Sequence, residues 1–248
     1  MPSLDWLTAR PVAHRGLHDA RQHIVENTPS AFEAAIAGGY GIECDLQISA
    51  DGEAIIHHDD ALGRLTEGSG RLDAMTTDDL KRIAFKATAD RMITLGELCE
   101  LVGGRATLVI EMKSRFDGDW RLVMRAAQVL SGYRGPAALM SFDPAPIAAL
   151  REIAPDLPRG MVAQRRYRPH GQDPAPRGRA RTLDYFAHAL RTRPQFIAYC
   201  VHDLPAAIPL MARGVFSLPL LTWTVRTVED RQRAARYADQ MIFEGFRP

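Results

Sequence analysis

The alternation of short apolar segments with longer amphipathic ones constrains the fold of this chain more than any other feature. Eight short runs are rich in β-forming residues and end in polar residues, and segments with helical periodicity lie between them. This order is typical of parallel strands joined by crossover helices. The length of 248 residues matches one closed barrel of eight such units, which needs roughly 250 residues. We therefore predict an α/β fold, a single (β/α)₈ TIM barrel that occupies residues 1–248.

The boundaries of the elements follow from the same pattern. The predicted strands are Pro11–Ala13, Gly41–Asp45, Thr107–Glu111, Ala137–Ser141, Arg159–Val162, Phe196–Cys200, Leu220–Thr224 and Gln240–Phe243. The predicted helices between them are Ser30–Ala37, Asp119–Leu130, Pro146–Ile153, Leu183–Leu190 and Val228–Tyr237. The first helix has a clear start, because Thr28 can cap it and Pro29 suits its first position.

One interval is too long for a simple strand–helix–strand unit. About sixty residues separate the second and third strands, where such a unit needs roughly thirty. The turn sequence Ala50-Asp51-Gly52 lies between two alternating segments and predicts a β-hairpin within residues 46–57. Irregular chain and a helix over Leu95–Val102 are expected to follow. We therefore predict that residues 46–94 form a small insertion after the second strand, on the face of the barrel where the strands end.

Charge and cysteine content limit the environment and the partners. The net charge of +1 provides no overall field for binding nucleic acid. The three cysteines form no CxxC pair, which argues against a disulfide framework or a zinc cluster and for a reducing compartment. No segment reaches the length of a membrane span, so we expect a cytoplasmic protein. Six arginines in Arg165–Arg181 predict a long loop that could touch an anionic membrane surface. The oligomeric state stays open.

Three carboxylates end strands that are neighbours in the predicted barrel. Glu43 and Asp45 share one face of the second strand because side chains alternate in direction, and Glu111 ends the third strand. Carboxylates at one rim form an oxygen-only site that favours Mg²⁺ or Ca²⁺ over zinc. Any one of them could instead pair with an arginine. Together, Glu43 and Asp45 indicate a cation, because like charges on one buried face repel without one.

Two histidines lie on separate segments beside this predicted metal site. His14 follows the first strand and His58 follows the hairpin, and an ordinary pKa near 6.5 suits both general acid and general base. Either histidine alone would be read as structural. Lys113 could steady a phosphate oxygen or neutralise Glu111, and Trp223 could be barrel packing or a wall for an apolar part of the ligand.

Several segments, taken in order, resemble the motifs of the glycerophosphodiester phosphodiesterase family. The opening motif consists of Ala13-His14-Arg15-Gly16 and Glu26-Asn27-Thr28. The later motifs are Glu43-Cys44-Asp45, Asp51-Gly52, His58-Asp59, Leu62, Arg64, Thr66, Ile110-Glu111-Met112-Lys113, Ser141-Phe142-Asp143 and Trp223-Thr224-Val225. The match spans most of the chain, and the ordered set is far more specific than any single motif.

The resemblance implies a (β/α)₈ barrel phosphoric diester hydrolase that cleaves a small glycerophosphodiester to glycerol 3-phosphate and an alcohol. It also implies one divalent cation, Mg²⁺ or Ca²⁺. The site residues that it implies are Glu43, Asp45 and Glu111 for the metal, His14 and His58 for acid–base catalysis, and Arg15, Lys113, Glu26 and Trp223 for the substrate.

Two positions depart from the family pattern, and three other functions stay open. Arg226 stands where an asparagine often follows Trp-Thr-Val, and Glu244 lies in a last-strand segment that lacks the usual Thr-Asp and nearby proline. These departures leave the contact surface for the alcohol undefined. The other functions are a phospholipase C- or sphingomyelinase D-like enzyme acting on intact lipid, an aldolase with Lys113 as Schiff-base lysine, and a non-catalytic barrel that binds phosphorylated ligands.

Overall fold

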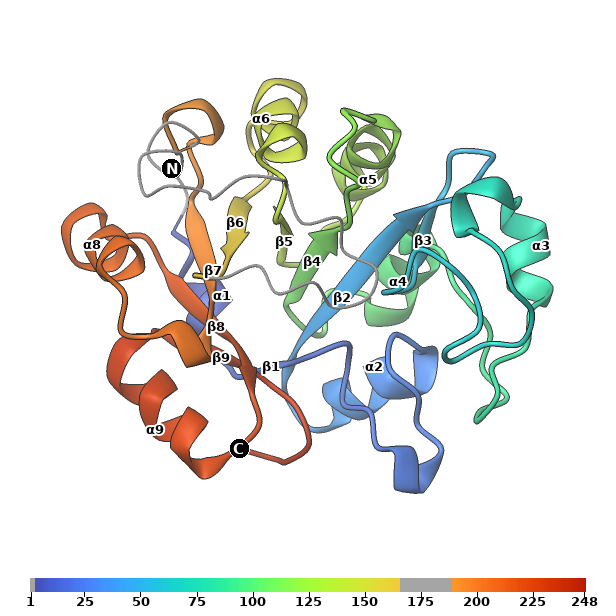
Figure 1. Ribbon diagram of the computed structural model, residues 1–248, viewed down its shortest axis with the longest axis horizontal. Helices are drawn as coiled ribbons and strands as arrows, with labels where there is room; N and C mark the ends of the chain where they lie inside the picture. Colours follow the sequence, from blue (N-terminus) through green and yellow to red (C-terminus); the bar gives the residue numbers. More distant parts are fainter. Residues whose placement is uncertain (1–2, 166–188) are drawn as a thin grey trace.

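A closed sheet of parallel strands forms the centre of the protein, with helices packed around it (Figure 1). The structure is a computed structural model that describes residues 3–165 and 189–248. In the order of pairing, the parallel strands are β1 (Val12–Ala13), β9 (Gln240–Phe243), β8 (Leu220–Val225), β7 (Phe196–Cys200), β6 (Arg159–Ala163), β5 (Ala137–Ser141), β4 (Leu108–Met112) and β2 (Gly41–Ile48). Pairing of β1 with both β2 and β9 closes the sheet. The predicted (β/α)₈ barrel is thus confirmed.

Helices connect the strands and pack outside the barrel. They are α2 (Pro29–Ala37), α4 (Leu95–Val102), α5 (Arg121–Ser131), α6 (Pro144–Ile153), α8 (Ala207–Phe216) and α9 (Val228–Tyr237). In the part of the chain that the structure describes, the shorter helices are α1 (Asp5–Thr8) and α3 (Thr77–Arg82), and the 3₁₀ turns are η1 (Ala20–Gln22), η2 (Leu72–Ala74) and η3 (Val201–Asp203). Thr94 and Thr227 begin α4 and α9 with capping boxes, which satisfy backbone groups that the first turn leaves free.

Some details differ from the sequence prediction. Thr28 is the N-cap residue of α2, but its hydroxyl donates to the Val25 carbonyl and accepts no bond from the helix. Helix α8 was missed because Pro209 and Gly214 lie inside it and weaken the helical pattern. Residues 183–188 of the predicted helix Leu183–Leu190, and residues 166–181 of the arginine-rich segment, lie outside the described residues.

Alternation along the strands separates two hydrophobic clusters. Ile42, Cys44 and Leu46 on β2 belong to the larger cluster, which includes residues of α2, α4, α5 and α6. Val109 on β4 belongs to the smaller cluster, whose other members come from α1 and from six further strands of the barrel. Successive side chains on a strand point to opposite faces. Glu43 and Asp45 on β2 therefore share the inner face, and so does Glu111, two residues after Val109.

The chain between β2 and α4 forms a hairpin and a small hydrophobic cluster of its own. The end of β2 pairs antiparallel with β3 (Ala54–Ile56), as the turn sequence predicted. The cluster unites Ile55, Leu72, Leu80, Phe85 and Met92, and Val25 joins it from the loop before α2. These apolar contacts fix a segment that carries little regular structure of its own.

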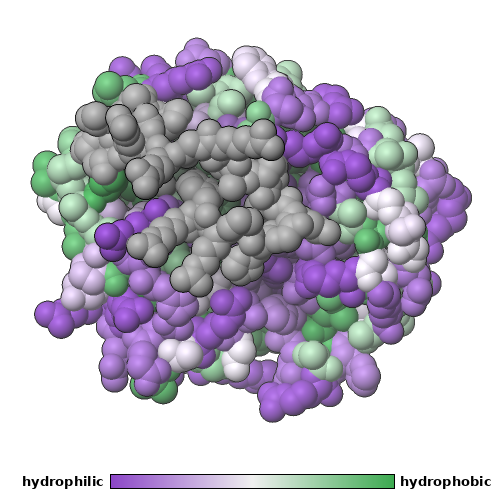
Figure 2. Space-filling view, viewed as in Figure 1, coloured by the Kyte–Doolittle hydropathy of each residue, from purple (hydrophilic) through white to green (hydrophobic). Residues whose placement is uncertain are grey.

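Polar residues predominate on the surface of the molecule that is seen in the direction of Figure 1. In the space-filling view, the surface around the residues drawn in grey is mostly hydrophilic, with separate hydrophobic areas among the polar ones (Figure 2). No helix in the ranges 3–165 and 189–248 combines the length and the hydropathy needed to cross a membrane.

Candidate active site

Three buried carboxylates meet at the inner rim where β2 and β4 end. Asp45 pairs in register with Glu111, and Glu43 lies two residues earlier on β2. One oxygen from each of the three side chains lies within 4.8 Å of the other two. Their side chains are between 1% and 10% exposed. The structure therefore brings together all three residues that the sequence assigned to a metal.

Two cations partly neutralise this cluster. The Lys113 Nζ atom lies 2.9 Å from Asp45 Oδ1 and 2.8 Å from Glu111 Oε1, and the Arg15 Nε atom lies 3.3 Å from Asp45 Oδ2. The argument from unpaired like charges was therefore incomplete, because Lys113 and Arg15 both pair with Asp45. Lys113 both neutralises Glu111 and lies at the site, so its two predicted roles do not exclude each other.

The pKa of Glu43 stays raised despite the two nearby cations. Burial raises the pKa of Glu43 well above its usual value, and the neighbouring Asp45 and Glu111 raise it further. Burial also acts to raise the pKa of Asp45, but Lys113, His58 and Arg15 outweigh it and hold that pKa well below its usual value. A bound cation would relieve the repulsion at Glu43. This oxygen-only donor set therefore fits a hard divalent ion.

A tight turn after β1 places Arg15 against the carboxylates. Arg15 and Gly16 have φ angles of 55° and 79°, and a Cβ atom on Gly16 would approach Ala31 to 2.8 Å, so only glycine fits there. The Arg15 backbone N–H donates to Glu43 Oε2 at 2.9 Å, and its Nη1 donates to Glu26 Oε1 at 2.7 Å. Glu26 thus holds the Arg15 guanidinium, and the resemblance had implied that both residues serve the substrate.

Asn27 is a site residue that the sequence analysis named only as part of the opening motif. Its Nδ2 donates to Asp45 Oδ2 at 2.8 Å, and its Oδ1 accepts from the Asp45 backbone N–H at 3.3 Å. Asn27 is buried and has a φ angle of 55°, a conformation that asparagine tolerates better than most residues. It therefore fixes the orientation of the Asp45 carboxylate.

His14 lies between the carboxylate cluster and the end of β9. Its Nδ1 atom is 2.7 Å from Glu244 Oε2, and its Nε2 atom is 3.9 Å from Glu43 Oε2. Burial would raise the pKa of Glu244, but hydrogen bonds from His14 and Arg226 hold that pKa well below its usual value. An ionised carboxylate only accepts, so Nδ1 carries the proton and Nε2 faces the site with a free lone pair. Burial lowers the pKa of His14 to about 4, although Glu244 opposes the shift.

His58 has a similar arrangement on the opposite segment. Its Nδ1 atom lies 2.8 Å from Asp59 Oδ1, and Asp59 Oδ2 accepts from Arg64 Nε at 2.6 Å. The Arg64 Nη2 atom also donates to Glu26 Oε1 at 2.7 Å, and Arg64 so connects the His58 side of the site with the Arg15 side. His58 lines the same cavity as Lys113, whose Nζ atom contacts Asp45 and Glu111.

A cavity of about 400 Å³ opens beside His58 and Lys113. One wall comes from the segment after β3 and contains Arg71 and Asp73, and the other comes from residues 114–119. Trp223 does not line this cavity. Its ring packs edge-to-face on Phe142 at a centroid distance of 5.5 Å and contacts the cluster inside the barrel.

The comparison with protein families covers nearly the whole chain. A model described as the glycerophosphoryl diester phosphodiesterase family matches residues 14–244. The chain belongs to this family. Membership in the glycerophosphoryl diester phosphodiesterase family makes it a phosphoric diester hydrolase, in agreement with the resemblance that its motifs suggested.

Relatives of the family agree in sequence and in fold. A glycerophosphodiester phosphodiesterase of Caldanaerobacter subterraneus subsp. tengcongensis is 30% identical over 236 residues, which are 90% of this chain and 88% of the relative. Among solved structures, an Oleispira antarctica phosphodiesterase in complex with sn-glycerol-3-phosphate superposes with a TM-score of 0.76 at 18% identity, over 96% of this chain and 94% of that chain. The structure of a putative glycerophosphoryl diester phosphodiesterase from Silicibacter pomeroyi superposes with a TM-score of 0.74 at 24% identity, over 94% of this chain and 89% of that chain. These structures share its fold.

The two departures from the family pattern are partners in the structure. The Arg226 Nη2 atom lies 2.8 Å from Glu244 Oε2, the same oxygen that lies beside His14. Sequence reasoning treated both residues as changes at a surface for the alcohol. The structure instead connects them to His14, and the signal that could have found them is the acidic residue directly after the last strand.

Proposed function

We propose that this chain hydrolyses glycerophosphodiesters to glycerol 3-phosphate and an alcohol, using one divalent cation and two histidines. The observation that carries the proposal is the arrangement around the buried carboxylates, where His14 and His58 each have Nδ1 bonded to a carboxylate. Both rings thereby present Nε2 as the reactive atom. The names of the relatives support the substrate class, because the Caldanaerobacter enzyme is a glycerophosphodiester phosphodiesterase.

In this proposal Glu43, Asp45 and Glu111 hold the cation, Mg²⁺ or Ca²⁺. When bound, the cation withdraws electron density from a phosphate oxygen and orients the substrate. Arg15 and Lys113 lie against the same carboxylates, where their charges offset negative charge that grows on the phosphate oxygens.

The two histidines divide the proton transfers. One Nε2 accepts the proton of the attacking hydroxyl, and the other ring donates a proton to the oxygen of the leaving alcohol. The attacking group is either water or a hydroxyl of the substrate's own glycerol, which would first give a cyclic phosphate. Detection of a cyclic product early in the reaction distinguishes the two routes.

We further propose that residues 46–94 act as an insertion that completes one side of the site. This segment supplies His58, Asp59 and Arg64, and together with residues 114–119 it encloses the cavity in which the alcohol would lie. We expect the enzyme to act in the cytoplasm, in keeping with its free cysteines, of which Cys44 and Cys99 are buried.

The Schiff-base alternative fits the site less well. Burial lowers the pKa of Lys113, but Asp45 and Glu111 outweigh it and raise the pKa above its usual value. The side chain is therefore a charged ammonium at neutral pH, whereas a Schiff-base lysine must be neutral to attack a carbonyl.

One assay tests the proposed function. Full-length protein is treated with EDTA and supplied with Mg²⁺ or Ca²⁺, and release of glycerol 3-phosphate is measured from glycerophosphocholine, glycerophosphoethanolamine and glycerophosphoinositol. We expect hydrolysis of at least one diester only when a cation is present. Unchanged activity after EDTA treatment, or faster cleavage of phosphatidylcholine vesicles than of any soluble diester, would contradict the proposal.

A further inference from the structure

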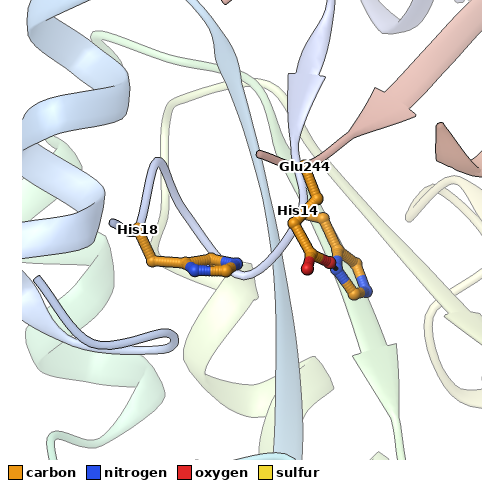
Figure 3. A group of neighbouring side chains, drawn as sticks. All are labelled: His14, His18 and Glu244. Atoms are coloured by element: carbon orange, nitrogen blue, oxygen red, sulfur yellow. Dashed lines mark hydrogen bonds and ion pairs between the residues drawn. The ribbon is translucent and has the colours of Figure 1, made fainter. Parts of the chain in front are cut away.

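A second group of metal-ligating side chains lies on the other side of His14 from the carboxylate cluster. His18 follows His14 by four residues in the loop after β1, and Glu244 directly follows β9. One ligand atom of each of these three residues lies within 4.8 Å of the other two. In Figure 3 the ring of His18 extends toward the Glu244 carboxylate, whose oxygens lie beside the ring of His14.

In the described part of the chain, one ring nitrogen of His18 lacks a hydrogen-bond partner, which indicates that a ligand binds there. Its Nε2 atom is buried and has no hydrogen-bond partner among the residues that the structure describes. Leaving such a polar atom buried without a partner costs free energy, and most buried polar atoms therefore have one. A metal ion satisfies an unprotonated imidazole nitrogen as well as a hydrogen-bond donor does.

We propose that His14, His18 and Glu244 form a second cation site, which binds Zn²⁺ or a similar transition-metal ion. Two imidazoles and one carboxylate are a common donor set for zinc, with water in the fourth position. The carboxylate cluster offers oxygen atoms only, and hard ions such as Mg²⁺ and Ca²⁺ prefer it. The two neighbouring sites therefore differ in the ions that they select.

Zinc binding requires small movements of these side chains. The His14 Nδ1 and Glu244 Oε2 atoms are 2.7 Å apart, whereas two ligands of a tetrahedral zinc ion are about 3.3 Å apart for bonds near 2.0 Å. Arg226 must give up its ion pair with Glu244 or share the carboxylate with the metal. This arginine is 52% exposed and able to turn toward solvent. The proton that His14 donates to Glu244 is released when the metal binds.

Occupation of this site inhibits the enzyme, a consequence that rests on the proposed function. With a metal on Nδ1, the single proton of a neutral imidazole is on Nε2. Nε2 then has no lone pair for the proton of the attacking hydroxyl, and Glu244 no longer holds the ring. Zinc therefore acts as an inhibitor even while Mg²⁺ fills the carboxylate site.

Zinc binding to the full-length protein tests the site without substrate. Titration calorimetry in excess Mg²⁺ compares the natural chain with His18→Ala, His18→Gln and the control His23→Ala, which removes an exposed histidine of the same loop. We expect binding to weaken more than about 100-fold in both His18 variants, because loss of even an outer-shell partner costs roughly 10- to 100-fold. The His23 variant should bind as the natural chain does. Arg226→Gln should bind more tightly.

Two results would overturn the inference. The first is equal zinc affinity of the natural chain and both His18 variants, and the second is no binding to the natural chain at millimolar Zn²⁺. In the activity assay, each variant is normalised to its own rate without zinc, and His18→Gln should need a higher zinc concentration for half-inhibition. Because calorimetry needs no turnover, failure of the proposed phosphodiesterase activity leaves the binding result interpretable.

Discussion

The Nδ1 atom of His14 lies 2.7 Å from Oε2 of Glu244, so the last strand of the barrel orients a histidine carried by the first. We predict that Glu244→Ala lowers kcat by about 10²-fold and changes KM little, because a misplaced acid–base group slows proton transfer without removing substrate contacts. Glu244→Gln keeps an acceptor for the Nδ1 proton and should retain more of the activity. Steady-state kinetics of both variants, with Glu229→Gln as an exposed control, check this prediction. Equal loss in the Ala and Gln variants would argue against a positioning role.

The two histidines should contribute more to turnover than Glu244 does. His14→Ala and His58→Ala are each expected to lower turnover by about 10²- to 10⁴-fold, the usual contribution of an acid or base. Circular dichroism should show an unchanged fold, since neither side chain belongs to the hydrophobic clusters. His202→Ala removes a histidine that is 64% exposed and serves as the control. Activity close to the natural rate in both variants would remove the pair from the mechanism.

Glu43 should control the affinity for the cation. We expect Glu43→Gln to raise the concentration of Mg²⁺ or Ca²⁺ needed for half-maximal rate, because an amide oxygen is a weaker ligand than a carboxylate. The measurement is initial rate against cation concentration after EDTA treatment. Glu53→Gln, which removes a carboxylate paired with Arg125 outside this cluster, is the matched control. The same half-maximal concentration in Glu43→Gln and the natural chain would exclude Glu43 from the metal site.

The ionisation of Glu26 should make the free energy of unfolding depend on pH. Burial would raise its pKa, but hydrogen bonds and charge from Arg64 and Arg15 lower it to about 2, compared with 4.5 in an unfolded chain. The ionised form is therefore favoured by folding. This stabilisation is complete above about pH 4.5 and is lost as the pH falls toward 2.

Urea unfolding of the natural chain and of Glu26→Gln measures this effect. At pH 7 we expect Glu26→Gln to be less stable by on the order of 3 kcal/mol, since the pKa falls from 4.5 to about 2 and one pKa unit corresponds to about 1.4 kcal/mol. The difference should shrink between pH 4.5 and the lowest pH at which both proteins fold. Glu33→Gln, whose ion pair with Arg105 is half exposed, should change stability by less than about 1 kcal/mol. A constant difference across this pH range would contradict the assignment.

Sequence periodicity predicted the barrel because each strand carries its own local signal. β5 and β7 were predicted with the bounds that the structure shows, and β2 extends three residues beyond the predicted Asp45 because its end continues into the hairpin. Helix α3 was missed because its six residues, with Thr77 at the first position, are too few to show a helical period. Short elements held by tertiary contacts leave little trace in a local pattern.

The site was predictable where it depends on alternation and motif order, and unpredictable where it depends on closure of the barrel. Glu43, Asp45 and Glu111 could be placed together because register on neighbouring parallel strands follows from the fold. The contact of His14 with Glu244 spans 230 positions. No local pattern reports such a pairing, so Glu244 was noticed in the sequence only as a departure.

Closure of the barrel by β1 also sets the order of events during synthesis. The two-residue strand β1 pairs with β2 on one side and with β9 on the other, so its second partner is made more than 200 residues later. A domain generally folds as a unit, so the barrel is completed only after β9 has been made. A ribosome-bound chain that lacks β9 has an open sheet edge and a His14 without its acceptor. We therefore expect the nascent enzyme to stay inactive, and exposed to aggregation, until its last strand leaves the ribosome.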